Sequence, residues 1–243
     1  MKQRIFTSLL LSSLVALASV GGQSQSVKPA DPELDKVEAM IGKAKKESEA
    51  FVKKGGKPGA ADDPNLKWAN LLWQYRLQHA ATPATTRATR VALDLLSRAD
   101  KVGELQANVD TLKLDDPAWR QVLYVLVNSA ARQHDNAYLY RQAQMLFESA
   151  ADRQIRAQAG FMLGEAYWKS GDQAHAKVTL QAVASQFADT PYADQAKGDL
   201  NEIENLNPGQ PAPSFSPTTI NGAPIALASF KGQVVVLKFW GSY

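Results

Sequence analysis

The sequence contains no cysteine in its 243 residues. This absence excludes a disulfide framework, catalysis by a thiol of this chain, and a metal site built from thiolates. The folded body must therefore be stabilised by its own hydrophobic core, and a chain of this length is long enough to form one.

Histidine is also scarce. The three histidines, His79, His134 and His175, are far apart in sequence and form no pair with metal-ligand spacing, so we expect each at the surface or satisfied in the core. The sequence has no Gly-x-Ser-x-Gly elbow, phosphate-binding loop or dinucleotide fingerprint. The acidic pairs Asp62-Asp63 and Asp115-Asp116 precede prolines, which is typical of helix caps. We predict no catalytic residue, no metal and no cofactor.

Neither sign of charge is in large excess. The 27 basic residues exceed the 24 acidic ones by three. Lys2 and Arg4 lie in an N-terminal segment without acidic residues, so the rest of the chain carries 25 − 24 = +1. This balance provides no electrostatic basis for binding nucleic acid. The densest basic run, residues 43–57, also contains Glu47 and Glu49 and is predicted to form a solvated helix face.

Long apolar runs are limited to the N-terminus. A basic start, Met1 to Arg4, precedes a mostly apolar stretch at residues 5–20, and Ala16-Leu17-Ala18 offers a small-x-small cleavage pattern. We therefore expect a Sec signal peptide at residues 1–22, a flexible linker at 23–30, and export to the periplasm or the extracellular space. The stretch is short for a membrane span, so no stable anchor is expected after cleavage, with a retained anchor as the alternative.

Residues 31–206 show helical periodicity and no strand pattern. Apolar residues recur at helical spacing after Asp31-Pro32, which predicts a first helix of roughly 20 residues that ends near Gly55. Capping residues followed by proline at Asp63-Pro64, Thr82-Pro83 and Asp116-Pro117 predict further helix starts. We therefore predict an all-α region of about eight or nine helices.

The last part of this region contains a repeat-like pattern. The residues that carry it are Leu163, Gly164, Tyr167, Gly171, Ala176 and Leu180. They resemble a tetratricopeptide unit, in which the Leu-Gly pair and the tyrosine face its first helix, a glycine ends that helix, and a small alanine lets the second helix pack closely. Ala143 and Phe147, 33 residues before the last two, indicate an earlier degenerate unit. We assign tetratricopeptide-like repeats to about residues 138–206, where the final helix from Pro191 forms a cap or half of a next repeat.

The C-terminal stretch, residues 207–243, has a different pattern. Asn221-Gly222 lies between two short stretches, 216–220 and 223–226, and predicts a hairpin. Lys231-Gly232 predicts a turn. The apolar, β-branched run at residues 234–239 then predicts a strand that is buried on both faces.

This stretch resembles the entry of a thioredoxin-like redoxin domain, as in the TlpA/ResA-like thiol-disulfide oxidoreductases of the AhpC/TSA family. The positions that match the family motif are Pro213, Phe215, Gly232, Phe239, Trp240 and Tyr243. In that family a Cys-x-x-Cys follows directly, so it would come after Tyr243. The overall expectation is a mainly α protein in which a helical-hairpin array precedes an incomplete thioredoxin-like α/β start.

The resemblance implies an exported thiol-disulfide oxidoreductase whose partners are protein dithiols or disulfides. Because this chain has no redox cysteines, we expect it to be inactive by itself. One alternative is an exported tetratricopeptide-like scaffold without enzymatic activity. A second is a peroxiredoxin-type antioxidant, if a peroxidatic cysteine follows.

Helical hairpins of this kind bind proteins or peptides in a groove, so the helical region is expected to bind partners or, alternatively, to act as a spacer or dimerising scaffold. Its aromatic residues are expected to pack between helices rather than to form a ligand-binding box. These residues are Trp68, Trp73, Trp119, Tyr138, Tyr140, Tyr167 and Trp168.

Overall fold

The computed structural model describes residues 31–206 and 209–238, so the predicted signal peptide and linker lie outside the described residues. The described residues form nine α-helices and one short 3-10 helix without an extended strand, which confirms a mainly α protein. The helices are α1 (Pro32–Lys53), α2 (Pro64–Gln78), α3 (Pro83–Arg98), α4 (Val102–Val109), α5 (Trp119–Gln133), α6 (Ala137–Ser149), α7 (Arg153–Lys169), α8 (Gln173–Gln186), α9 (Pro191–Asn205) and the 3-10 helix η1 (Leu227–Phe230).

Prolines that follow a capping residue start several helices where the sequence indicates. Asp63 accepts a hydrogen bond from the backbone N–H of Asn65 at 2.9 Å, and α2 begins at the intervening proline. Thr82 and Thr85 form a reciprocal capping box at the start of α3. Such side chains satisfy amides that have no partner inside the helix, and proline has no amide to satisfy. These predicted starts are confirmed.

The start of α5 lies two residues later than predicted from Asp116-Pro117. The helix begins at Trp119, and Ala118 before it provides no side-chain cap. One oxygen of Asp116 accepts a hydrogen bond from the N–H of Ala118 at 2.9 Å, so the carboxylate caps the turn that leads into the helix. The other oxygen forms an ion pair with Arg76 of α2. The partner is 40 residues distant, so no local pattern reveals it.

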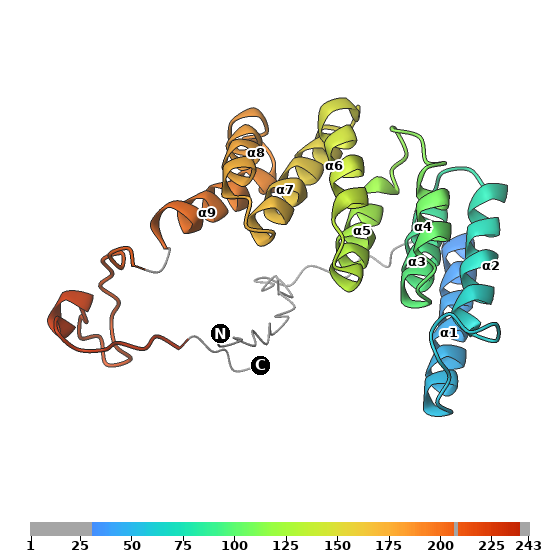
Figure 1. Ribbon diagram of the computed structural model, residues 1–243, viewed down its shortest axis with the longest axis horizontal. Helices are drawn as coiled ribbons and strands as arrows, with labels where there is room; N and C mark the ends of the chain where they lie inside the picture. Colours follow the sequence, from blue (N-terminus) through green and yellow to red (C-terminus); the bar gives the residue numbers. More distant parts are fainter. Residues whose placement is uncertain (1–30, 207–208, 239–243) are drawn as a thin grey trace, which may run out of the picture. The chain divides into compact units, whose positions relative to one another are not determined.

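The helices pack mainly against their neighbours in chain order, as Figure 1 shows. The helices α1, α2 and α3 contact one another, and α3 also contacts α4 and α5. The helix α7 contacts α5, α6, α8 and α9. Packing between sequence neighbours is typical of helical arrays. The core contains large side chains with less than 2 % exposure, among them Trp119, Phe187, Leu72, Leu93, Leu123, Leu146, Leu163 and Leu180.

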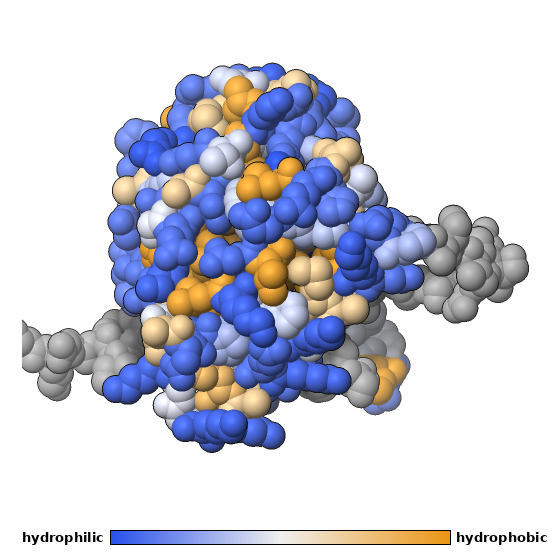
Figure 2. Space-filling model, turned by 90° about the vertical axis from the view of Figure 1, so that its right-hand side faces the viewer, coloured by the Kyte–Doolittle hydropathy of each residue, from blue (hydrophilic) through white to orange (hydrophobic). Residues whose placement is uncertain are grey.

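The first helical hairpin lies at one end of the array. Figure 2 shows apolar patches scattered among polar side chains on this face of the molecule. The large apolar residues exposed on α1 and α2 are Val52, Leu71 and Leu77. Single exposed apolar residues are common on protein surfaces and require no partner.

No helix among the described residues is long and apolar enough to cross a bilayer.

The glycine predicted to end the first helix of the repeat lies directly after α7. Gly171 has a φ of 89°, a left-handed conformation that glycine adopts without strain. Its N–H bonds to the carbonyl of Trp168 at 2.9 Å, and the N–H of Asp172 bonds to the carbonyl of Tyr167 at 2.9 Å. These bonds satisfy the last carbonyls of α7 and turn the chain into α8.

The predicted hairpin in the C-terminal stretch is reduced to a turn and a single bridge. Thr218 and Pro224 make one isolated antiparallel bridge. The turn is closed by a bond of 2.9 Å from the N–H of Gly222 to the carbonyl of Thr219, so it centres on Ile220-Asn221, one residue earlier than the Asn-Gly pair. Pro217 and Pro224 lie within the two pairing segments, and proline cannot donate to a strand ladder, so the pairing remains short.

The predicted Lys-Gly turn is confirmed. Lys231 has φ −57° and ψ 129°, and Gly232 has a φ of 86°. The N–H of Gln233 bonds to the carbonyl of Phe230 at 2.9 Å. These values define a type II turn, which requires a positive φ at its third residue.

The strand predicted after this turn is not present in the described residues. Residues 234–238 carry no strand assignment, and Val234 and Val236 are 96 % and 84 % exposed instead of buried on both faces. A buried central strand requires neighbouring strands on both sides and helices on both faces. The described residues provide neither for this segment, so its β-forming side chains remain exposed. A thioredoxin-like α/β start is therefore not seen.

Candidate functional site

One side of α5 presents a continuous stripe of side chains. Arg120, Tyr124, Val127, Ala131 and His134 are three or four residues apart, so they lie on the same side of the helix. Tyr124 is 47 % exposed although it is a large aromatic residue. His134 ends the helix in a left-handed conformation with a φ of 53°.

The helices α7 and α9 continue this surface. α7 contacts α5 and also α9. Burial and an interaction with Tyr124 of α5 raise the pKa of Tyr192 of α9, so side chains of the two outer helices meet across α7. The ring of Phe161 lies 6.0 Å from that of Tyr192. We name this surface the α5–α7–α9 face; it comprises Arg120, Tyr124, Val127, Ala131 and His134 of α5, Phe161, Met162, Glu165 and Lys169 of α7, and Tyr192, Asp199 and Glu202 of α9.

A pocket of about 320 Å³ opens on this face between α5 and α7. Buried apolar side chains form its floor, and exposed or charged residues form its rim. A volume in this range suits a small ligand or an inserted side chain, and an apolar floor with a few polar groups is typical of binding sites. The floor consists of Ala130, Leu139, Met162 and Ala166, and the rim includes Val127, Ala131, His134, Asn136, Glu165 and Lys169.

Carboxylates predominate on the part of the face where α7 meets α9. Lys169 pairs with Glu165 at 2.9 Å. Asp199 has one buried carboxylate oxygen without a hydrogen-bond partner. Burial raises the pKa of Asp199, repulsion from Glu165 and Glu202 adds to this rise, and Lys169 opposes it, so that the pKa is about 6. The charged form of Asp199 is therefore disfavoured by its surroundings.

We expect Asp199→Asn to raise the melting temperature at pH 7.5. The pKa of Asp199 is about 6 in the folded protein and 3.8 ordinarily, so its stabilising contribution is complete below pH 3.8 and is lost as the pH rises through 6. Asparagine removes this dependence. The advantage of the variant should therefore shrink as the pH falls from 7.5 to 4.5, which thermal melts followed by circular dichroism measure.

The matched control is Asp194→Asn on the same helix. Asp194 is 80 % exposed and pairs with Lys197 at 3.0 Å. The melting temperature of Asp194→Asn should stay close to that of the wild type across the pH range, because exposed ion pairs contribute little to stability. A lower melting temperature of Asp199→Asn than of the wild type at pH 7.5 would contradict the claim that the charged form of Asp199 is disfavoured in the folded protein.

The structure brings the six predicted repeat residues together in the α7–α8 hairpin. Leu163 and Leu180 are buried, and Ala176 is fully buried. A Cβ added to Gly164 would lie 2.7 Å from Cδ2 of Leu180, so this glycine permits close approach of the two helices. Tyr167 stacks on Tyr140 of α6 with ring centroids 4.8 Å apart. These residues shape the hairpin, and none of them lines the pocket.

The earlier unit indicated by Ala143 and Phe147 corresponds to α6. Ala143 is fully buried, as Ala176 is in α8. Phe147 is partly buried, and its ring lies 2.6 Å from where a Cβ of Gly160 would be. The centroid of its ring also lies 6.0 Å from the centroid of the Phe187 ring. The two positions therefore contribute to packing between successive hairpins.

The predicted redoxin motif positions do not form a site in the described residues. Pro213 is exposed and Phe215 is partly exposed, and the carbonyl of Phe215 accepts a hydrogen bond from the N–H of Leu227 at 3.3 Å. Gly232 occupies the type II turn. The other three positions, Phe239, Trp240 and Tyr243, lie outside the described residues.

The histidines are separate from one another. His79 stacks on the ring of Tyr75 with centroids 4.0 Å apart. His175 pairs with Asp172 at 2.7 Å at the start of α8. His134 lies on the rim of the pocket. No group of histidine and acidic side chains within residues 31–206 and 209–238 could hold a metal ion.

The aromatic residues expected to pack between helices do so. Trp68, Trp73 and Trp119 are buried, and the indole N–H of Trp119 donates to the carbonyl of Lys113 at 2.8 Å. The remaining four are partly buried against the helical core. The partly buried residues are Tyr138, Tyr140, Tyr167 and Trp168.

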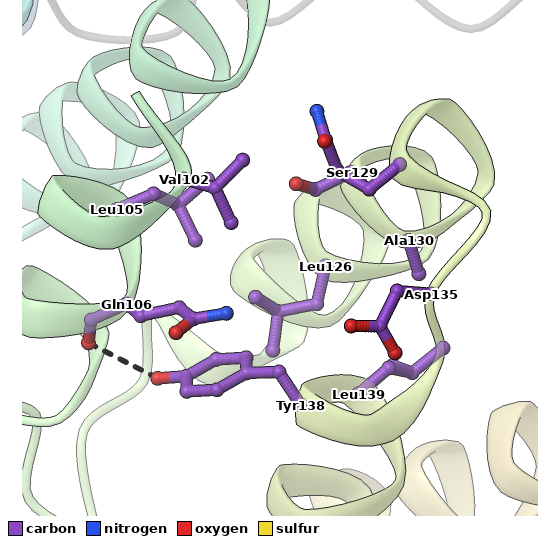
Figure 3. A pocket seen from close by; sticks show the side chains of 10 residues that line it. Val102, Leu105, Gln106, Leu126, Ser129, Ala130, Asp135, Tyr138 and Leu139 are labelled. Carbon is purple, nitrogen blue, oxygen red and sulfur yellow. Dashed lines mark hydrogen bonds between the residues drawn. The ribbon is translucent and has the colours of Figure 1, made fainter. Parts of the chain in front are cut away.

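A second, much smaller pocket of about 30 Å³ lies between α4, α5 and α6 (Figure 3). The hydroxyl of Tyr138 donates to the carbonyl of Gln106 at 3.1 Å and to Asp110 at 2.8 Å. Leu126 and Leu139 form part of its wall. This space holds about one water molecule, so it is a packing feature rather than a ligand site.

The residues of the α5–α7–α9 face that distinguish it from a packing surface were not indicated by the sequence. Tyr124 and Tyr192 belong to no motif, and Asp199 has a neighbour 34 residues earlier in Glu165. The spacing of Tyr124, Val127 and Ala131 is the one signal that was available. It indicates a common helix side but not that this side remains open.

Comparison with protein-family models, with curated proteins and with solved structures finds no match for this chain.

Proposed function

We propose that the helical region, residues 32–205, binds a polypeptide segment of a partner protein on the α5–α7–α9 face. The observation that carries this proposal is the pocket of about 320 Å³ between α5 and α7, which has a buried apolar floor and a partly exposed rim that includes polar and charged side chains. An inserted apolar side chain would bury itself in the floor. The rim would hold the adjoining peptide backbone through hydrogen bonds.

The rest of the face fits an extended ligand better than a compact one. Tyr124 lies one turn before Val127 on the same stripe, so an exposed aromatic residue adjoins the pocket. Tyrosine contributes contact area and a hydrogen bond at low entropic cost and is enriched at protein interfaces. The hydroxyl of Tyr192 is protonated at neutral pH, as that of an ordinary tyrosine is, so that it can donate a hydrogen bond.

We assign α7, α8 and α9 to a tetratricopeptide-like unit and its cap. The motif residues on α7 and α8 support the unit, since they provide the close helix contact at Gly164 and the turn at Gly171. The outer side of α9 supports a cap rather than half of a further repeat, because it is exposed and polar. Its exposed residues include Asp194, Gln195, Lys197 and Asn201.

A displayed library of random twelve-residue peptides tests the proposal. Purified protein should select peptides whose binding is lost in Ala131→Arg, because the long side chain blocks the pocket mouth from an exposed helix position. We expect affinity to fall at least about tenfold, measured by fluorescence polarisation. Ala174→Arg is the matched control, since Ala174 is an exposed alanine of α8 and does not line the pocket.

Two results would contradict partner binding at this face. The first is a selection that yields no peptide. The second is a set of peptides that bind the wild type, Ala131→Arg and Ala174→Arg equally, which would place the contact elsewhere. Melting temperatures of both variants equal to that of the wild type exclude unfolding as the cause of any loss.

A second proposal concerns the C-terminal stretch, which we assign to the entry of a thioredoxin-like domain in an exported thiol-disulfide oxidoreductase. The type II turn at Lys231-Gly232 supports it, because it directs the chain into an exposed apolar run suited to pairing in a sheet. This chain has no cysteine, so an insulin-reduction assay should detect no activity from it. Activity above background would contradict the expected inactivity of this chain. Loss of residues 1–22 on export, measured by mass spectrometry, tests the signal peptide.

A further inference from the structure

The pocket and the carboxylates of the α5–α7–α9 face are connected through Glu165 and Lys169 of α7. Glu165 belongs to the rim of the pocket and is also one of the charges that act on Asp199. A ligand that occupies the pocket and continues toward α9 therefore passes Glu165 and reaches Asp199 and Glu202. The pocket and the carboxylates form one continuous site.

The charge on this part of the face is unbalanced. Glu165, Asp199 and Glu202 provide three carboxylates, and the cation that acts on Asp199 is Lys169, which is already paired with Glu165 at 2.9 Å. One oxygen of Asp199 is buried and accepts no hydrogen bond. This oxygen has no surface open to solvent, so a cation on the ligand would act on the carboxyl group through its charge rather than through a hydrogen bond to this atom.

We propose that the polypeptide segment bound on this face carries a lysine or arginine side chain that pairs with Asp199 and Glu202, next to an apolar side chain in the α5–α7 pocket. This inference rests on the proposed function and specifies the chemistry of the ligand. An arginine guanidinium has several donors in a planar fork and can pair with the carboxyl group of Asp199 while it neutralises Glu202. The apolar neighbour provides burial, and the cation provides selectivity.

The raised pKa of Asp199 agrees with this arrangement. Desolvation and the two neighbouring carboxylates favour the protonated form of its carboxyl group. A ligand cation favours the charged form. Binding should therefore lower the pKa of Asp199 and should weaken at a pH well below 6, where the carboxyl group is protonated in the free protein.

The direct test uses Nα-acetylarginine amide as the probe and follows the side-chain carboxyl signal of Asp199 in protein labelled with ¹³C-aspartate. Asp199→Asn identifies that signal. We expect the probe to lower the pKa of Asp199 from about 6 toward its usual 3.8. Nα-acetylcitrulline amide has nearly the same shape without the charge and should leave the pKa unchanged at equal ionic strength.

The outcomes separate this inference from the proposed function. An arginine probe with no effect, or with the same effect as the citrulline probe, would overturn the inference. An equal response to calcium ions would indicate a metal site instead and would also overturn it. Library peptides that lose binding in Ala131→Arg but contain no excess of lysine or arginine would leave the proposed function intact and reject the cationic ligand.

A double variant adds a second measurement. Asp199→Asn combined with Glu202→Gln keeps the size of both side chains and removes their charges. Selected peptides that contain lysine or arginine should bind this variant at least about tenfold more weakly than the wild type. Their citrulline or norleucine versions should bind both proteins equally. Equal binding of the charged peptides to the two proteins would contradict the assigned contact.

Discussion

Asp116→Ala is expected to lower the free energy of unfolding by about 3 kcal/mol, at the lower end of the range for breaking a buried ion pair. The side chain of Asp116 is 9 % exposed and that of its partner Arg76 is 16 % exposed. Removal of the carboxylate leaves the guanidinium without its partner in a mostly buried position. It also removes the acceptor for the N–H of Ala118. Urea denaturation followed by tryptophan fluorescence measures the loss.

The adjacent residue provides the control. Asp115 is exposed, so Asp115→Ala should change the free energy of unfolding by less than about 0.5 kcal/mol. Arg76→Met combined with Asp116→Ala should recover part of the loss, because no unpaired charge remains. Equal losses in Asp115→Ala and Asp116→Ala would show that the pair does not connect α2 to the start of α5.

Gly164→Ala is expected to lower the free energy of unfolding by about 1 to 3 kcal/mol. Alanine normally stabilises a helix relative to glycine. Here the added Cβ would lie 2.7 Å from Cγ and Cδ2 of Leu180, which is fully buried and has no space to move into. Thermal and urea unfolding should both show the destabilisation.

Gly198 provides a control of the same residue type. It lies 34 residues after Gly164, in the interior of α9, and an added Cβ would meet no atom within 4 Å. Gly198→Ala should therefore stabilise the protein by about 0.5 to 1 kcal/mol. If Gly164→Ala and Gly198→Ala changed the free energy of unfolding in the same direction, α7 and α8 would not be in the close contact seen here.

The helical part of the fold could be predicted because its signals are local. Asp63 and Thr82 each cap a helix whose first residue is proline, so a few neighbouring residues determine each start. Gly171 likewise ends α7 through its own left-handed conformation. The Asp116 pair with Arg76 depends instead on tertiary structure. The strand predicted from residue 234 onward is absent from the described residues because β-propensity acts only where neighbouring strands and covering helices are present.

The candidate site was less accessible to sequence reasoning than the fold. The residues of the repeat pattern, such as Leu163 and Leu180, are conspicuous because they pack the hairpin, and they do not line the pocket. Tyr124 belongs to the site because its ring remains exposed, and Asp199 belongs to it because one of its oxygens has no hydrogen-bond partner. Both properties depend on how α5, α7 and α9 are placed. A single sequence records which residues are apolar or charged but not which of their contacts are missing.

Methionine methyl NMR tests the central proposal most directly. Met162 lines the pocket on the α5–α7–α9 face, whereas Met40 of α1 and Met145 of α6 do not line it and serve as internal controls in the same sample. In protein labelled with ¹³C-methyl methionine, a library-selected peptide should shift the Met162 signal and leave those of Met40 and Met145 in place. An unchanged Met162 signal together with a shifted signal of Met40 or Met145 would contradict binding at this face.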